Sequence, residues 1–304
     1  MTSLRTGSKA HRSVLIGLIG EGVGPSLTPA MHELEGARHG LSYVYRAVDM
    51  KPGEAEPARL QALLDSARRL GFDGLNVTHP AKQAIVPLLD SLAPSAASVE
   101  AVNTVVFSDG RAVGHNTDVT AFAASIDEAR DGESLGFTVL IGAGGAGAAV
   151  ARAIAERQPE HFVVVDIDAD RAAALASATG AAGTGADELV DLVPRADTVV
   201  NATPLGMVAH PGAAVDPALL QPRTLVVDIV YRPVDTALVR GARDRGCRVV
   251  TGLGMAMNQA ADAFEIFTGE PADRAAMLAD LTDLVAAEAT RNPAHVAPMK
   301  GQER

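Results

Sequence analysis

Short apolar runs alternate with amphipathic stretches along the chain, and the first four runs predict β-strands. These runs extend over Ser13 to Gly20, Leu41 to Val48, Gly74 to Val77 and Val102 to Phe107. Between them, apolar residues recur at helical spacing from Pro29 to Gly40 and from Ala58 to Leu70, which predicts two helices. The pattern indicates a first α/β unit.

From Phe137 the alternation becomes a cleaner repeat. Its strands read Thr-Val-Leu-Ile-Gly, Phe-Val-Val-Val-Asp, Thr-Val-Val-Asn, Leu-Val-Val-Asp and Arg-Val-Val-Thr, with an Ala-rich helix after the first and another helix from Asp170. Continuous apolar strands joined through helices indicate a parallel sheet that helices cover on both faces. Two further helices are predicted over Ala256 to Phe267 and Ala275 to Ala289.

The change of pattern divides the chain into two predicted α/β domains, residues 13–118 and residues 119–254. A chain of 304 residues is long enough for two domains with separate cores. Residues 1–12 and 291–304 are polar and carry no pattern, so both are predicted to be mobile tails.

Composition narrows the class of protein. The net charge of -11 repels phosphate backbones and anionic bilayers, which argues against nucleic-acid and membrane-surface partners. The single cysteine, Cys247, excludes an intrachain disulfide framework and fits a reducing compartment. No apolar run approaches the roughly 20 residues of a membrane span, and the first residues lack the apolar section of a signal peptide. We therefore expect a cytoplasmic protein.

A glycine-rich loop follows the strand that begins at Phe137 and opens the next helix, the context that a dinucleotide-binding fingerprint requires. The first glycine of such a loop allows a tight turn, the second lets the backbone approach a pyrophosphate, and the third lets the helix pack close to the strand. The loop consists of Gly142, Ala143, Gly144, Gly145, Ala146 and Gly147. It predicts a Rossmann-type, doubly wound nucleotide-binding domain.

An acidic residue at the end of the next strand favours NAD over NADP. Asp166 stands where the fingerprint places the acid that binds the adenosine ribose hydroxyls. A carboxylate there repels a 2'-phosphate, and the following residues are Ile167 and Asp168 rather than arginine.

Lys82 is a candidate proton carrier. Only four of the 26 basic residues are lysines (Lys9, Lys51, Lys82 and Lys300), so the chain generally uses arginine where it needs only positive charge. Lysine can release its proton in a suitable environment, whereas arginine cannot. Lys82 also follows a strand end and a Pro-containing turn, where polar side chains such as Asn76 and Thr78 can face a cleft.

A second polar cluster comprises Asn103 and Thr104 and the segment from Gly114 to Asp118, again at ends of predicted strands. We assign Asn103 and Asp118 to the site, and an aspartate beside Lys82 would orient its amine and titrate with it as a coupled pair. For Asn116 and Thr117, turn formation has equal weight. The eight histidines show no metal-ligand spacing, so no metal site is predicted.

Taken together, these motifs resemble the shikimate dehydrogenase family over nearly the whole chain, from Ile16 to about Ala289. Chance does not assemble so many matching segments in order. The segments are Gly24 to His32, Asn76 to Lys82, Ala101 to Val105, Gly114 to Asp118, Gly142 to Gly147, Asn201 to Met207, Asp228 to Pro233 and Gly252 to Ala260.

The resemblance implies roles for residues along the chain. It implies that Lys82 and Asp118 form a catalytic pair, and that the C-terminal helices, residues 255–290, complete the first domain as a substrate-binding domain across a cleft from the second. Implied contacts to the substrate carboxylate and hydroxyls come from Ser26, Thr28, Asn76, Thr78, Asn103, Tyr231 and Gln259. Implied contacts to the cofactor come, besides the glycine loop, from Asp166, Asp168, Arg171, Thr203, Gly252 and Met255.

Three departures from the family pattern refine the expected activity. Asp166-Ile167-Asp168 replaces the Asn-Arg-Thr of NADP-using biosynthetic members, and Thr28 replaces a serine, as in members that accept quinate. Met255-Ala256-Met257-Asn258 replaces the usual Met-Leu-x-His and leaves the packing around Gln259 open. The implied activity is NAD-linked interconversion of quinate or shikimate with the 3-dehydro acid at the C3 hydroxyl, in quinate catabolism or aromatic amino acid biosynthesis.

Alternatives remain open at this point. An NADP-type biosynthetic shikimate dehydrogenase is the first, a tetrahydrofolate dehydrogenase/cyclohydrolase the second, and a non-catalytic cofactor-binding protein the third. The Ser-x-Thr-Pro and Asn-Thr-Asp segments argue against the second, and the presence of both Lys82 and Asp118 argues against the third. Expected partners are NAD and the small-molecule acid, and a homodimer is allowed.

Overall fold

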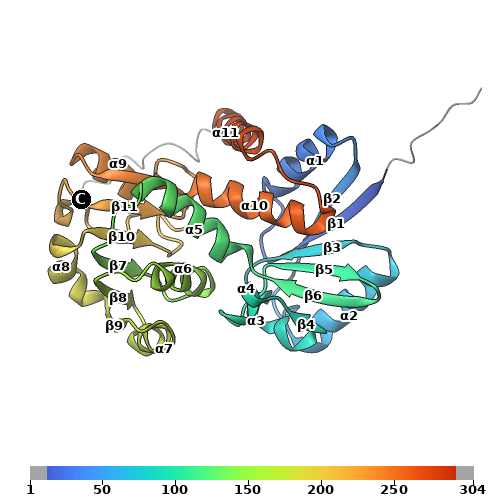
Figure 1. Ribbon diagram of the computed structural model, residues 1–304, viewed down its shortest axis with the longest axis horizontal. Coiled ribbons are helices and arrows are strands. Elements are labelled where there is room, and N and C mark those ends of the chain that lie inside the picture. Colours follow the sequence, from blue (N-terminus) through green and yellow to red (C-terminus); the bar gives the residue numbers. More distant parts are fainter. Residues whose placement is uncertain (1–11, 292–304) are drawn as a thin grey trace, which may run out of the picture.

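Two six-stranded sheets organise residues 12–291, the part of the chain that this computed structural model describes (Figure 1). Apart from Arg12 and the backbone of Arg291, the predicted tails lie outside the described residues. No helix within this range is long and apolar enough to cross a membrane.

The first sheet is mixed, with strand order β2-β1-β3-β5-β6-β4. The first three strands in this order run parallel, β5 is antiparallel to both β3 and β6, and β4 is parallel to β6. Their bounds are β1 Ser13–Gly20, β2 Ser42–Asp49, β3 Gly74–Val77, β4 Ser91–Leu92, β5 Thr104–Ser108 and β6 Arg111–His115.

Helices cover both faces of this sheet. Leu60 and Leu64 of α2 (Pro57–Arg69) pack with Leu75 on one face. On the other face, Phe264 of α10 (Gly252–Thr268) packs with Tyr43 and other strand residues, beside α1 (Thr28–Arg38). Short helices α3 (Ala81–Ala84) and α4 (Pro94–Ala97) follow β3 and β4.

The second sheet is parallel throughout, with strand order β12-β11-β10-β7-β8-β9, which confirms the predicted doubly wound sheet. One buried cluster lies under α5, α6 and α7, and another lies under α8 and α9. The strands are β7 Phe137–Ile141, β8 His161–Asp166, β9 Ala182–Gly185, β10 Thr198–Asn201, β11 Leu225–Asp228 and β12 Arg248–Thr251. The helices are α5 Thr117–Arg130, α6 Gly145–Glu156, α7 Ala169–Thr179, α8 Leu189–Leu192 and α9 Ala237–Asp244.

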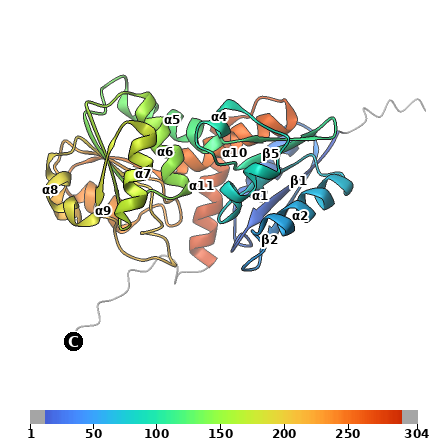
Figure 2. The same cartoon turned by 90° about the horizontal axis from the view of Figure 1, so that it is seen from below.

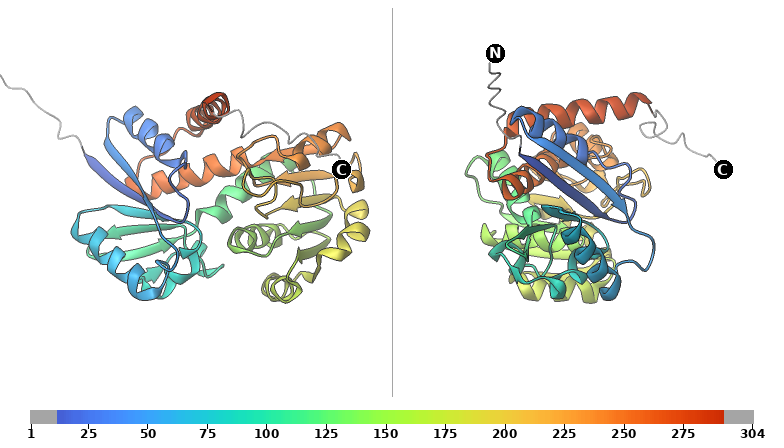
Figure 3. Two further views of the ribbon diagram at one scale, coloured as in Figure 1. Left: turned by 180° about the vertical axis from the view of Figure 1, so that it is seen from behind. Right: turned by 90° about the vertical axis from the view of Figure 1, so that its right-hand side faces the viewer.

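After the second sheet the chain returns to the first. α10 runs from β12 back toward β1, alongside α5, and α11 (Arg274–Arg291) packs against α10 and α1. Figure 2 shows α11 between the two halves of the molecule, and the right-hand view of Figure 3 shows it lengthwise along one edge. The arrangement is a two-domain α/β fold, while the residue bounds set for the two domains stay predictions.

The predicted start of the penultimate helix, α10, was wrong. α10 begins at Gly252, four residues before the predicted Ala256. The predicted start was too late because Gly252 and Gly254 are residues typical of a loop. In the structure Gly252 lies against the backbone of Ile229, and a Cβ atom at Gly252 would be 2.3 Å from the Ile229 carbonyl oxygen. This glycine therefore serves a close approach of helix and loop.

Candidate active site

Strand direction brings the candidate segments of the first sheet to one edge. Because β1 and β3 are parallel neighbours, the loops that carry Ser26 and Lys82 leave the sheet side by side. β5 runs the other way, so Asn103 at its start lies at the same edge, and β6 returns there to lead into Asp118. Segments far apart in sequence thus meet at this edge.

Lys82 and Asp118 form a largely buried ion pair. Lys82 Nζ donates a hydrogen bond to Asp118 Oδ2 at 2.7 Å, and the two side chains are 17% and 3% exposed. Lys82 lies in α3, just after the turn that contains the cis His79–Pro80 bond. The structure therefore brings together the two residues predicted as a proton-transfer pair.

Asp118 is held from three directions. It lies in the first turn of α5, where the helix dipole favours a negative charge. Asn103 Nδ2 donates to its Oδ1 at 3.0 Å, on the side away from Lys82. Asn116 caps the helix, because its side chain accepts from the Asp118 backbone N–H at 3.0 Å and donates to Ala101 O. The turn-forming role of Asn116, left open above, is the one observed.

Asn76 and Asn103 already use their amide hydrogens within the protein. Asn103 Nδ2 donates to Thr117 Oγ1 and Asp118 Oδ1, and Asn76 Nδ2 donates to Asn103 O and Thr104 Oγ1. A direct donation from either amide to a substrate requires that one of these bonds be exchanged. Their predicted substrate contacts stay predictions, and their observed function is to order this edge of the sheet.

The remaining predicted substrate residues surround this edge. Ser26 and Thr28 share a turn at the start of α1, where Ser26 Oγ accepts from the Thr28 N–H at 3.3 Å. Thr78 lies beside the end of β1, since a Cβ atom at Gly20 would be 2.3 Å from its Cγ2. The backbone oxygen of Gln259, on α10, accepts from Thr117 Oγ1 at 3.2 Å.

Tyr231 comes from the second sheet, just after β11, and packs against a cluster that includes Met31 and Met257. Burial raises the pKa of its hydroxyl, so Tyr231 stays protonated at neutral pH. Residues that follow the carboxyl ends of the second sheet thus reach the elements of the first.

The glycine loop has the geometry that a pyrophosphate site needs. Gly142 has a φ of +107°, and a Cβ at Gly147 would be 2.1 Å from Gly142 O, so a side chain at either position would distort the turn. By contrast, nothing lies within 4 Å of a Cβ atom placed on Gly144 or Gly145. The loop backbone at the amino end of α6 is therefore open to an anionic ligand.

Asp166 joins this loop to the next one. Its Oδ2 accepts from the Ala143 N–H at 2.7 Å and its Oδ1 accepts from the Asp168 N–H at 2.9 Å. Asp168 caps α7, and the hydrogen bond from the Arg171 N–H lowers the pKa of its carboxyl group. The Arg171 guanidinium lies 3.3 Å from Asp168. Two carboxylates thus stand at the carboxyl end of β8.

Ile167, between these aspartates, is 91% exposed. Thr203 follows β10 at the same edge of the sheet and bonds the Asn201 side chain through its N–H and its hydroxyl. Gly252 begins α10, and Met255 is buried in the core cluster of the second sheet, so its predicted contact with a cofactor stays a prediction.

Sequence reasoning gave no site role to three residues that support the site. Tyr45 is 3% exposed and donates to Asn76, Thr104 links Asn76 to Asn103, and Arg232 joins the two halves of the molecule. The alternating pattern of its strand predicts only that Tyr45 is a core residue, and an arginine next to a proline predicts only a surface turn. Only Thr104, adjacent to Asn103, carried a signal in the sequence.

Arg232 ties the loop of Tyr231 to the loop of Ser26. Its Nη1 donates to Pro25 O at 2.7 Å, and its Nε donates to Glu288 of α11 at 2.8 Å. Pro25 immediately precedes Ser26, so this bridge holds the predicted substrate loop against the second half of the chain.

Breaking the bridge is expected to weaken substrate binding. Arg232→Gln should raise the KM for the acid substrate that the resemblance implies about threefold to tenfold, in line with the loss of a partly exposed ion pair and one hydrogen bond, and leave the Kd for the implied nicotinamide cofactor unchanged. Steady-state kinetics and a cofactor titration check this. Arg243→Gln, which breaks the exposed pair with Asp235, is the control. An unchanged KM in Arg232→Gln would contradict the role.

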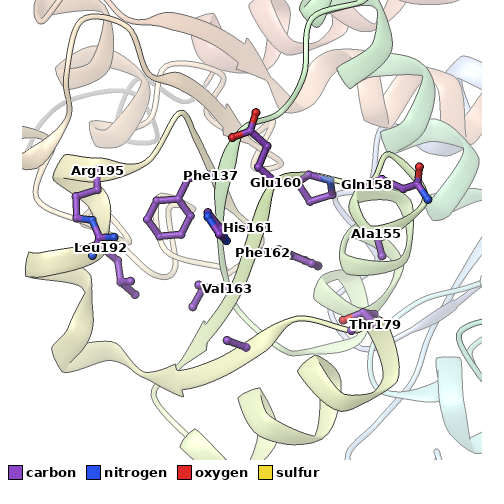
Figure 4. A pocket seen from close by; sticks show the side chains of 13 residues that line it. Phe137, Ala155, Gln158, Glu160, His161, Phe162, Val163, Thr179, Leu192 and Arg195 are labelled. Carbon is purple, nitrogen blue, oxygen red and sulfur yellow. The ribbon is translucent and has the colours of Figure 1, made fainter.

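A surface hollow in the described structure lies elsewhere. It has a volume of about 600 Å³ and is lined by Phe137 and His161, the first residues of β7 and β8, together with Arg195 (Figure 4). The glycine loop and Asp166 follow the opposite, carboxyl ends of these strands. A smaller hollow touches Asn116 and Thr117 from the side of α10. Within residues 12–291 no group of histidine, cysteine and acidic side chains is placed to hold a metal.

Three family models match successive parts of the chain. "Shikimate dehydrogenase substrate binding domain" matches residues 18–105, "Shikimate / quinate 5-dehydrogenase" matches residues 134–241, and "Shikimate 5'-dehydrogenase C-terminal domain" matches residues 252–281. The matches include strands of both sheets, although not β6 or β12, and the returning helix.

Some similar proteins are named as NADP-dependent and others as NAD-dependent. A shikimate dehydrogenase (NADP(+)) from Streptomyces avermitilis is 50% identical, over 92% of this chain and 99% of its own length. A quinate/shikimate dehydrogenase (NAD(+)) from Corynebacterium efficiens is 47% identical, over 90% of this chain and 99% of its own length. Quinate dehydrogenase from Corynebacterium glutamicum, solved in complex with NAD, gives a TM-score of 0.83 at 43% identity and covers 90% of this chain and 100% of that one.

Proposed function

Since the chain belongs to the shikimate dehydrogenase family of nicotinamide-dependent oxidoreductases, we propose that it is an NAD-dependent quinate/shikimate dehydrogenase. It would oxidise one ring hydroxyl of quinate, and of shikimate, to the 3-dehydro acid. The observation that carries the choice of NAD is the pair of carboxylates, Asp166 and Asp168, at the end of β8.

The residues present fit a dinucleotide. The open backbone at Gly144 and Gly145 suits a pyrophosphate, and Asp166 suits ribose hydroxyls, from which its oxygens can accept further hydrogen bonds. A 2'-phosphate would instead meet two carboxylates and the uncharged Ile167. Arg171, the nearest guanidinium, is already paired with Asp168.

Proton transfer falls to Lys82. When bound, the nicotinamide supplies the hydride acceptor. Lys82 Nζ would take the proton of the substrate hydroxyl as the carbon loses its hydride, so the nitrogen must carry a free lone pair when the substrate binds. Asp118, 2.7 Å away, holds the nitrogen in place and offsets the charge that it gains. Neutral donors such as Ser26 and Thr28 would bind the substrate carboxylate.

The position of the reacting hydroxyl is part of the proposal. The family model that matches residues 134–241 numbers the oxidised carbon 5, whereas we place the reaction at C3. Both carbons lie two bonds from the carbon that bears the carboxylate, and reversing the direction of counting exchanges them. A positional label on the substrate is therefore the appropriate test of this point.

The second candidate is an NADP-linked shikimate dehydrogenase, which the name of the 50% identical relative favours. Initial rates with quinate and with shikimate, each with NAD and with NADP, separate the two. We expect efficient NADH formation from quinate, slower or equal turnover of shikimate, and weak activity with NADP. Turnover of shikimate with NADP alone would replace the proposal by the second candidate.

A further inference from the structure

A buried chain of side-chain hydrogen bonds runs behind the Lys82–Asp118 pair and ends at Tyr45. It passes from Asp118 to Asn103 at 3.0 Å, to Thr104 at 2.9 Å, to Asn76 at 3.0 Å and to the Tyr45 hydroxyl at 2.7 Å. None of these residues is more than 5% exposed, so water does not compete for the bonds.

The order of strands explains how the chain reaches so far. Tyr45 lies on β2 opposite Ile16 of β1, and Asn76 lies on β3 opposite Leu18 of the same strand. Residues two apart share a face of a sheet, so the tyrosine side chain crosses β1 on that face and meets Asn76. Its length is needed because a whole strand separates the partners.

Each bond in the chain has a defined direction. Tyr45 must donate, since the Asn76 oxygen carries no hydrogen, and burial raises the pKa of Tyr45 well above its usual value and keeps its proton in place. Asn76 then presents its amide hydrogens to Thr104 Oγ1, and the Thr104 hydroxyl donates its one proton to Asn103 Oδ1. Asn103 is left to present its amide hydrogens to Asp118.

A reversed Asn103 amide would place its carbonyl oxygen against the carboxylate of Asp118. The Thr117 N–H also donates to Asn103 Oδ1, at 2.9 Å, and supports the observed orientation. The orientation of Asn103 toward Asp118 is therefore set by the Thr117 N–H directly and by the chain that extends through Thr104 and Asn76 to Tyr45.

We propose that Tyr45 and Thr104 are positioning residues for Asp118, which act through Asn76 and Asn103 and touch neither substrate nor cofactor. The inference rests on the proposed role of the Lys82–Asp118 pair. A weaker donation from Asn103 leaves more negative charge on Asp118 to retain the proton on Lys82, so the oxidation reaction needs a higher pH to release it.

The test compares Tyr45→Phe with Tyr43→Phe. Both remove a buried hydroxyl from β2, but the hydroxyl of Tyr43 bonds His32 rather than the chain to Asp118. Tyr45→Phe is expected to lower kcat about tenfold and to move the ascending limb of the kcat/KM pH profile to higher pH, with an unchanged Kd for NAD. Tyr43→Phe should reduce thermal stability comparably and keep the wild-type pH profile.

Variants of Thr104, a second residue of the hydrogen-bond chain, keep the inference testable if Tyr45→Phe fails to fold. Thr104→Val should reproduce the loss of kcat and the shifted profile, and Thr104→Ser, which keeps the hydroxyl, should restore both. Because both variants interrupt one chain, the double variant Tyr45→Phe/Thr104→Val should lose much less than the product of the single losses. A wild-type profile in Tyr45→Phe and Thr104→Val overturns the inference.

Failure of the proposed function gives a different result. In that case the wild type itself would oxidise neither quinate nor shikimate with either cofactor. If the wild type is active and only the pH profiles of the variants are unmoved, the positioning role alone is lost.

Discussion

Replacing Lys82 by methionine is expected to lower kcat for quinate oxidation about a thousandfold, the usual contribution of a positioned general acid or base. Methionine has nearly the length of lysine and is apolar, so Asp118 keeps its bonds to Asn103 and to the helix terminus but loses its ion-pair partner. Initial rates of NADH formation measure the loss. A cofactor titration should give the wild-type Kd for NAD.

Two further variants show whether charge or proton transfer matters at this position. Lys82→Arg keeps a positive charge beside Asp118 but cannot release a proton, so it should be nearly as inactive as Lys82→Met. Lys51→Met removes an exposed lysine and should match the wild type. Retention of more than a tenth of the wild-type kcat by Lys82→Arg would contradict the proton-transfer role.

The second large effect is expected at the end of β8. In the triple variant Asp166→Asn, Ile167→Arg and Asp168→Thr, the two carboxylates that would face a 2'-phosphate in the proposed site are removed and a guanidinium is supplied. The ratio of kcat/KM for NAD to that for NADP should fall about a hundredfold, because Arg binds phosphate strongly while the ribose loses its acceptor. Parallel rates with the two cofactors measure the ratio.

The single variant Asp166→Asn separates the roles of this residue. An asparagine oxygen can accept from one of the two backbone N–H groups that Asp166 now binds, and its amide hydrogens would face the other. Thermal stability should therefore fall together with NAD affinity. Asp191→Asn, an exposed aspartate on α8, is the control and should change neither. An unchanged cofactor ratio in the triple variant would remove the argument for NAD.

The contact between Lys82 and Asp118 was predictable because its signals are local. Lys82 is a rare lysine after a strand end, and Asp118 closes a short polar segment, so strand order alone brings them together. The glycine loop and Asp166 were predictable for the same reason, since a strand, a turn and a helix arrive in order. The parallel second sheet followed from its continuous apolar runs.

Supporting residues depend on contacts between distant segments and escaped the sequence. Arg232 meets partners 207 and 56 positions away, at Pro25 and Glu288, and no periodicity predicts such pairs. Tyr45 fits the alternation of apolar and polar residues expected of a core strand, and this alternation does not predict its hydrogen bond across β1. The strand β9, Ala-Gly-Thr-Gly, carries almost no apolar signal and pairs only because β8 lies beside it.

The central claim is that hydride leaves C3 of the substrate for the nicotinamide while Lys82 takes the hydroxyl proton. Quinate deuterated at C3, and separately at C5, tests it with NAD and the wild-type enzyme. The account predicts that mass spectrometry finds deuterium in the NADH formed from the C3-labelled acid alone. With either labelled acid, Lys82→Met should lose the same fraction of the wild-type rate of NADH formation. Unlabelled NADH from C3-labelled quinate, or no NADH at all, would contradict it.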